Sequence, residues 1–96
     1  MKFEWDEEKN RINISKHGLS FEDAIQIFDG PVVSWRDERR DYGELRKHTL
    51  GLFRGTLILA VIHTDRGNKI RIISARRADK DERKMYEAAL HKTTHN

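Results

Sequence analysis

Cysteine is absent from this chain of 96 residues, and its absence removes several kinds of chemistry at once. Without thiols there is no disulfide, no thiolate zinc ligand and no cysteine nucleophile. The sequence also lacks an HExxH zinc motif, a glycine-rich phosphate loop and a Gly-x-Ser-x-Gly elbow. A chain without cysteine fits a reducing compartment, so a cytoplasmic location is expected.

Long hydrophobic runs are also missing. The longest apolar stretch, residues 56–62, is far shorter than the roughly 20 residues that a membrane-spanning helix needs. The first ten residues hold no apolar segment, so no signal peptide is expected. No internal repeat appears, and this length fits one domain with a small core. We expect a single domain over residues 1–91 and a frayed tail over residues 92–96.

The charge balance is mildly basic, with a formal net charge of +3 despite 16 acidic residues. Such a balance favours an anionic partner without identifying one. The most informative stretch is residues 66–77, RGNKIRIISARR, which holds five basic residues, no acid and the alternation of a β-strand. Cations fixed along a strand suit a phosphate backbone. A half-exposed strand with soluble basic edges explains the pattern equally well.

Capping residues and apolar spacing predict the local structure. Asp6 and Gly18 bound a first helix, Ser20 caps a second, and Asp79 with Glu82 forms an acidic capping box for a last one. The predicted helices are residues 6–17, the segment from Ser20 to Gly30, and residues 80–91. The predicted strands are residues 2–5, 32–36, 45–53, 56–64 and 69–77.

The element order β-α-α-β-β-β-β-α predicts an α+β domain with an antiparallel sheet packed against helices. If both hairpin turns are tight, Arg46, His63 and Ile70 lie side by side. One sheet face then forms the core, with Leu50, Leu52, Leu57, Leu59, Val61, Ile70 and Ile72. The other mixes small or aliphatic residues with cations such as Lys47, Arg71 and Arg77, and offers a floor for RNA. A slip of one residue exchanges the faces.

The polar stripe on the first helix is one candidate for chemistry. It contains Asp6, Lys9, Asn13, Lys16 and His17, and it ends at the helix C-terminus. A lysine and histidine pair can bind phosphate or move a proton near neutral pH. The alternative is a solvated face whose basic residues complement the helix dipole.

Other candidates each have a structural alternative. His48 and His63 lie near opposite ends of adjacent predicted strands with no third ligand at a suitable spacing, so neither a metal site nor a cofactor is expected. Tyr86 is either a base-stacking or proton-donating group or an aromatic at the edge of the core. Trp35, followed by Arg36, Arg39 and Arg40, could stack on a base or form a partner surface.

Two blocks of this chain resemble the BrnT toxin family. They are WDEEKNRINISKHGLSFEDA at residues 5–24 and IRIISARRA at residues 70–78, followed by Glu82 and Tyr86. The resemblance covers about residues 3–88, and residues 34–46 match only in general character. It implies a compact RelE-like fold and a toxin of a bacterial type II toxin–antitoxin system that cleaves RNA without a metal and inhibits translation and growth.

The resemblance also implies the partners. It points to a BrnA-like antitoxin with a ribbon-helix-helix part, which neutralises the toxin and represses the operon with it, contacting operator DNA through the antitoxin alone. No membrane partner is implied. Two rival readings remain open, namely an RNA- or ribosome-binding module that does not cleave, and a protein scaffold of a repressor complex.

Metal-free RNA cleavage needs a base for the 2′-hydroxyl, cations for the extra charge on phosphorus and an acid for the leaving oxygen. The candidate catalytic residues are His17, Lys16, Arg71 and Arg76. The candidate substrate-binding residues are Arg77, Lys47, Lys9 and Tyr86. By strand alternation Arg76 points away from Arg71 and Arg77, so these arginines share one face only if the strand bends near Ala75.

Overall fold

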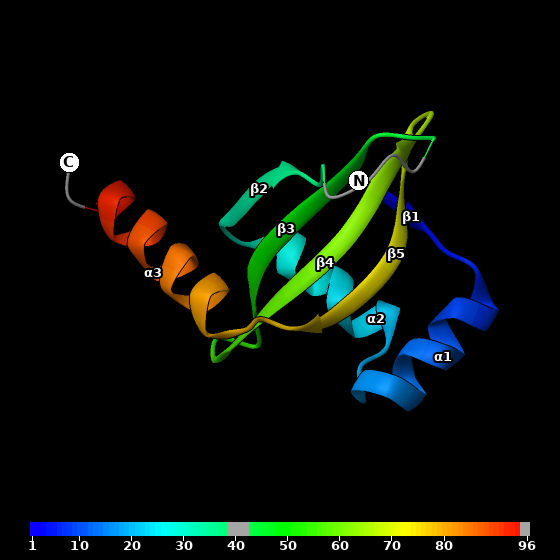
Figure 1. Ribbon diagram of the computed structural model, residues 1–96, viewed down its shortest axis with the longest axis horizontal. Helices are drawn as coiled ribbons and strands as arrows, with labels where there is room; N and C mark the ends of the chain where they lie inside the picture. The colour runs from blue at the N-terminus through cyan, green and yellow to red at the C-terminus, as the bar shows by residue number, and fades with distance from the viewer. Residues whose placement is uncertain (39–42, 95–96) are drawn as a thin grey trace.

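A computed structural model describes residues 1–38 and 43–94 (Figure 1). The elements follow the predicted order, except that the predicted second helix is an α-helix only over Phe21–Ala24 and continues as a 3₁₀ helix over Ile25–Asp29. They are β1 (Lys2–Glu4), α1 (Glu7–His17), α2 (Phe21–Ala24), η1 (Ile25–Asp29), β2 (Val32–Arg36), β3 (Arg46–Phe53), β4 (Leu57–Arg66), β5 (Lys69–Arg77) and α3 (Lys80–Thr94). Helix α3 continues to Thr94, past the end that the sequence predicted at His91.

The five strands form one mixed sheet in the order β1-β5-β4-β3-β2. Strands β2 to β5 are antiparallel neighbours, as predicted. Strand β1 instead pairs in parallel with β5, with Phe3 opposite Ile70. The prediction of a purely antiparallel sheet is therefore wrong at this edge. Strand β1 is not joined to β5 by a hairpin. The helices α1 and α2 and the strands β2 to β4 lie between them in the chain, so the two strands can run in the same direction.

Helix α1 is capped as predicted and is held to the sheet by polar contacts. Asp6 accepts hydrogen bonds from the backbone of the first turn, and Gly18 ends the helix with φ of 67°. The amide of Asn13 donates to the carbonyls of Leu19 and Ala75 at 2.8 Å, and the Ala75 backbone N–H donates back to Asn13 at 3.1 Å. Asn13 thus joins α1 to β5, and is not part of a solvated polar stripe.

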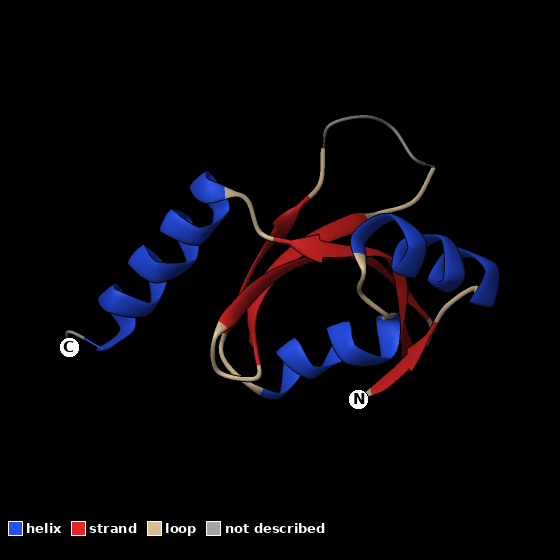
Figure 2. Ribbon diagram, turned by 90° about the horizontal axis from the view of Figure 1, so that it is seen from below, coloured by secondary structure: helices blue, strands red, loops and turns tan. Residues whose placement is uncertain are grey.

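One face of the sheet, here called the α2 face, carries the main core. Leu59, Val61, Ile72 and Ala75 project from β4 and β5 on this face and pack against Phe21, Ala24 and Ile27. Figure 2 shows α2 and η1 lying beneath the curved sheet. At Gly51 a Cβ atom would lie 2.6 Å from Cβ of Ile27, so only glycine allows this close approach.

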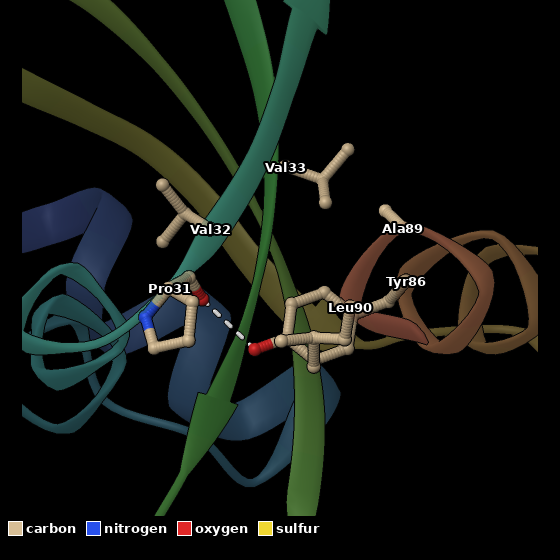
Figure 3. Close-up of a pocket in the computed structure, with 6 residues that line it drawn as sticks. All are labelled: Pro31, Val32, Val33, Tyr86, Ala89 and Leu90. Atoms are coloured by element: carbon tan, nitrogen blue, oxygen red, sulfur yellow. Dashed lines mark hydrogen bonds between the residues drawn. The ribbon is translucent and has the colours of Figure 1, made fainter. Parts of the chain in front are cut away.

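The opposite face, here called the α3 face, carries a smaller core of Leu50, Ile58 and Ala60 under Ala78 and Tyr86. Helix α3 projects away from the body of the molecule beyond the end of β5 (Figures 1 and 2). Tyr86 fixes this helix to the edge strand, because its hydroxyl donates to the carbonyl of Pro31 at 2.8 Å (Figure 3).

The register between β3 and β4 differs by one residue from the prediction. The loop has three residues, with positive φ at Arg54 and Gly55, and Phe53 pairs with Leu57. Arg46 therefore pairs with Thr64, whereas the prediction placed it beside His63. This slip puts Leu50 and Leu52 on the α3 face, while Leu57, Leu59, Val61, Ile70 and Ile72 lie on the α2 face as predicted.

A β-bulge in β5 changes which arginines lie together. Ile62 pairs with Ser74 and His63 pairs with Ile72, so Ile73 is an extra residue in β5. Arg71 pairs with Thr64 and Arg76 with Ala60, and both partners lie on the α3 face. The bulge thus brings Arg71 and Arg76 to one face and turns Arg77, the partner of Leu59, to the other.

Candidate active site

A carboxylate at the start of α3 organises the polar end of the α3 face. Glu82 and Asp79 form the predicted capping box, in which the Asp79 backbone N–H donates to Glu82 at 2.9 Å and the Glu82 N–H donates to Asp79 at 2.8 Å. The same Glu82 carboxylate accepts two hydrogen bonds from Arg76, at 2.7 and 3.0 Å. This two-point geometry is the strong form of an arginine–carboxylate pair.

His48 completes the group. Its Nε2 atom lies 2.7 Å from Oε2 of Glu82, and its ring stacks on Trp35 with centroids 4.3 Å apart and planes 19° apart. The stack follows from the register, because Trp35 on β2 pairs directly with His48 on β3. We call Trp35, His48, Arg76 and Glu82 the Glu82 cluster.

Electrostatics keep the carboxylate of Glu82 ionised. Burial alone would raise its pKa, but hydrogen bonds from Arg76 and the Asp79 backbone, together with the positive charge of Arg76 and the neighbouring imidazole of His48, lower the pKa to about 2. Glu82 is therefore an anion at any physiological pH, and it can orient two basic side chains at once.

The cluster opens into a hollow of about 320 Å³. Its lining residues are Trp35, Arg36, Asp37, Glu38, His48, Arg76, Asp79 and Glu82. Carboxylates outnumber arginines among these residues, so the hollow as a whole is not positively charged. Arg76 retains about a third of its side-chain exposure, whereas Glu82 and His48 are about nine-tenths buried. Arg76 is thus the cation of the cluster best placed to meet a phosphate.

The other predicted catalytic arginine lies elsewhere on the same face. Arg71 donates to Glu4 on β1 at 2.9 Å, and Lys69 lies 3.9 Å from the same carboxylate. Arg71 and Arg76 are five positions apart along β5, which corresponds to at most roughly 16 Å at about 3.3 Å per residue. The two arginines share a face but cannot hold one phosphate together.

The structure does not bring the predicted base to the Glu82 cluster. Lys16 and His17 are exposed in the last turn of α1, whose following segment packs on the α2 face through Leu19. Arg77 points to this side, opposite Arg76. Lys9 is exposed on α1. The combination of Arg76 with His17 stays a prediction, and the contacts described here join Arg76 to Glu82 instead.

Two further predicted residues have structural partners. Tyr86 is 1% exposed and joins α3 to β2, and burial raises its pKa, so its ring is part of the smaller core. Pro31, Val32, Val33, Ala89 and Leu90 surround it in a small apolar pocket (Figure 3). Lys47 lies on the α2 face, 3.4 Å from Asp65. Arg39 and Arg40, named with Trp35 as a base-stacking group, lie outside the described residues.

His48 and the second role of Glu82 were missed from the sequence. The spacing of Asp79 and Glu82 revealed the capping box, but nothing local shows that the same carboxylate also meets β3 and β5. His48 was considered only as a metal ligand. Within residues 1–38 and 43–94, no group of three or more histidine, aspartate or glutamate side chains is arranged to hold a metal ion. None of the described helices is long and apolar enough to cross a membrane.

Comparison with known proteins gives a consistent result. The model of a family described as the ribonuclease toxin BrnT of type II toxin–antitoxin systems matches residues 5–82. The chain is also similar to the crystal structure of the Brucella abortus ribonuclease toxin BrnT, with 34% identity and a TM-score of 0.68, over 83% of this chain and 99% of that one. A search of curated proteins gave no match. The match of 78 residues includes every member of the Glu82 cluster.

Proposed function

We propose that this chain, which belongs to the BrnT family of ribonuclease toxins of type II toxin–antitoxin systems, cleaves RNA at the Glu82 cluster without a metal ion. The observation that carries the proposal is that one ionised carboxylate holds an arginine and a histidine side by side. Those are the cation and the proton carrier that metal-free cleavage requires.

The reaction proceeds by attack of the substrate on itself. His48 takes the proton of the 2′-hydroxyl, the 2′-oxygen forms a bond to the adjacent phosphorus, and the bond to the 5′-oxygen breaks. The leaving 5′-oxygen takes a proton from solvent, and His48 later returns its own proton to solvent. The products carry a 2′,3′-cyclic phosphate and a 5′-hydroxyl, and no net proton is consumed.

Arg76 stabilises the negative charge that builds on the phosphate oxygens. Its guanidinium is charged at every working pH and presents several donors in one plane. In the free protein two of its donors meet Glu82. An arriving phosphate competes with Glu82 for the guanidinium of Arg76. The Glu82 carboxylate remains paired with His48 and favours the protonated form of this histidine during attack.

Trp35 holds the histidine ring in place. The indole stacks on His48 and also lines the hollow, so the orientation of the proton carrier is fixed by an aromatic contact on one side and a carboxylate on the other. A base with a fixed ring orientation is worth about 10²- to 10⁴-fold in rate.

The partner follows from membership of the family. A toxin of a type II system has a protein antitoxin, and we propose a BrnA-like antitoxin with a ribbon-helix-helix part. Ribbon-helix-helix domains pair by two-fold symmetry, so the complex would contain at least two antitoxin chains. Repression of the operon would use operator DNA contacts made by the antitoxin. Co-expression that restores growth, and co-purification of the two chains, would test this part.

The proposed activity is tested with purified protein and a labelled RNA in an excess of EDTA. Cleavage that leaves 2′,3′-cyclic phosphate ends supports the proposal. Intact RNA together with tight binding would favour the rival function, an RNA- or ribosome-binding module in which Arg76 binds phosphate but no base acts. Cleavage that appears only when Mg²⁺ is restored would contradict the metal-free mechanism.

A further inference from the structure

A second hollow, of about 440 Å³, lies near the end of β2 but is built on the α2 face. Its lining residues are Ser34, Trp35, Arg36, Leu45, Lys47, His63, Asp65 and Ile70. The register explains why they meet, because Lys47 pairs with His63 and with Arg36, and Asp65 pairs with Ile70. The volume lies in the range of about 300–1,000 Å³ typical of small-ligand sites.

A buried polar chain runs beside this hollow. The hydroxyls of Ser34 and Thr49 lie 2.7 Å apart, and Thr49 Oγ1 lies 2.7 Å from Nε2 of His63. His63 is 4% exposed and packs edge-on against Phe28. Its Nδ1 atom has no hydrogen-bond partner among the described residues. Nδ1 has almost no exposed surface and Nε2 is held by Thr49, so His63 forms part of the wall of the hollow.

The charge of His63 is suppressed. Burial lowers its pKa to about 4, with Lys47 and His48 acting in the same direction and Asp65 opposing them. The imidazole is thus neutral near pH 7 and contributes hydrogen bonding instead of charge. His63 therefore adds no positive charge to the wall of the hollow near pH 7.

The rim of the hollow supplies the other contacts that a nucleotide needs. Lys47 and Arg36 are neighbours across β2 and β3, and both side chains are more than 40% exposed. Leu45 is 48% exposed, and with the half-buried Ile70 it offers an apolar surface for a planar ring. Asp65, 3.4 Å from Lys47, is an acceptor for exocyclic amino groups. Cation, apolar surface and polar edge therefore occur in one hollow.

The position of this hollow connects it to the Glu82 cluster. Trp35 and Arg36 line both hollows, one on each face of the sheet. Strand β2 is the edge strand, with a described neighbour on one side only. A single strand of RNA can therefore pass from one face to the other over the outer side of β2 without crossing another strand of the sheet.

We propose that the hollow on the α2 face binds one nucleotide of the RNA, next to the bond cleaved at the Glu82 cluster, and reads its base. The base lies against Leu45 and Ile70, its polar edge meets Ser34 and Asp65, and its phosphate meets Lys47 and Arg36. We call this hollow the nucleotide subsite. The inference rests on the proposed function, because the bound strand is the substrate of the cluster.

Sequence preference is the first test. Wild-type protein and the variants Lys47→Ala, Asp65→Asn and Ser34→Ala are given a pool of short RNAs with random bases around the cut, and the product ends are sequenced. Asp65→Asn should change base preference by about tenfold at one position beside the cut. Lys47→Ala should raise KM by about tenfold with kcat nearly unchanged. Lys84→Ala, which removes an exposed lysine from α3, is the matched control and should change neither.

The outcomes separate the subsite from the activity. If the wild type cleaves RNA and all three subsite variants keep its base preference and KM, the nucleotide subsite is wrong and the cleavage site stands. If Lys47→Ala and Lys84→Ala raise KM equally, only general charge is at work, and the subsite is again wrong.

A binding experiment judges the subsite even if the wild type does not cleave. The ligand is an oligonucleotide with 2′-deoxy sugars at every position, which lacks the attacking hydroxyl. Lys47→Ala should weaken binding by about tenfold and reduce the salt slope by about one phosphate contact, and Lys84→Ala should do neither. Free mononucleotides form a second arm. Competition by a mononucleotide at the affinity of the oligonucleotide would show a metabolite site and overturn the assignment to an RNA strand.

Discussion

Arg76 and Glu82 face each other as a two-point pair, with Nη1 2.7 Å from Oε1 and Nη2 3.0 Å from Oε2. Arg76 leaves the sheet at the end of β5 and Glu82 lies in the first turn of α3, so the pair spans the junction of strand and helix. The same carboxylate holds His48 from β3. The junction therefore assembles the cluster, and each of its members can be tested separately.

Glu82→Gln should separate the structural role of Glu82 from its electrostatic role. Glutamine keeps the capping-box hydrogen bond to the Asp79 backbone but removes the negative charge between Arg76 and His48. We expect the variant to fold, with RNA cleavage reduced by about 10- to 100-fold, since removal of a fixed electrostatic partner weakens the orientation of both groups. Circular dichroism and a single-turnover cleavage assay measure the two effects. Activity equal to that of the wild type would show that the carboxylate only caps the helix.

His48→Gln should abolish the proton transfer that we assign to His48. The expected loss in kcat is about 10²- to 10⁴-fold. The matched variant is His17→Ala, which removes an exposed imidazole on the other side of the sheet and should leave kcat unchanged. A large loss in His17→Ala with normal rates in His48→Gln would show that the general base is His17 on α1 and not His48.

The lowered pKa of His63 predicts how stability depends on pH. The folded protein binds a proton at His63 only near pH 4, whereas the unfolded chain binds one near pH 6.5. The unfolded state thus holds more protons between these values, and the contribution of His63 is complete above pH 6.5 and is lost as the pH falls toward 4. The full effect is at most about 3 kcal/mol.

Urea unfolding of the wild type and of His63→Gln, each from pH 7.5 to pH 4, measures this contribution. The unfolding free energy of the wild type should fall relative to that of His63→Gln as the pH falls below 6.5. Glu82 does not affect the comparison, because both proteins carry it and its stabilisation begins to be lost only near its ordinary value of 4.5. A difference that stays constant over the whole range would contradict the lowered pKa.

Gly51→Ala should destabilise the fold through a steric clash. The new methyl group would lie 2.6 Å from Cβ of Ile27 in η1, and one strand or the helix must move to relieve it. Overpacking of this kind costs about 1–3 kcal/mol. Chemical unfolding measures the loss, and Gly30→Ala, at a position where a Cβ atom meets nothing within 4 Å, is the control. Equal stability of both variants would show that η1 and β3 are less closely packed.

The sequence predicted well what depends on near neighbours. Asp6, Gly18, Ser20 and the pair of Asp79 and Glu82 form the predicted helix ends, because each cap involves residues within four positions of one another. These contacts need no knowledge of the rest of the chain.

The sequence could not predict what depends on register. A loop of three residues at Arg54, instead of two, moved Leu50 to the other face. The extra residue Ile73 moved Arg76 to the face of Arg71, although no glycine or proline marks the bulge. His48 and Glu82 are 34 positions apart, on β3 and α3, and no local pattern shows that they meet. The candidate site in the structure therefore contains the predicted Arg76, but its histidine is His48 and not His17.

Arg76→Ala compared with Arg71→Ala, in single-turnover cleavage of RNA with EDTA present, tests the central claim most directly. Both substitutions remove an arginine from the same sheet face, and each leaves a glutamate without its arginine, namely Glu82 or Glu4. The account predicts a rate reduced by about 10²- to 10³-fold for Arg76→Ala and by less than about threefold for Arg71→Ala. Equal losses in the two variants, or a larger loss in Arg71→Ala, would contradict cleavage at the Glu82 cluster.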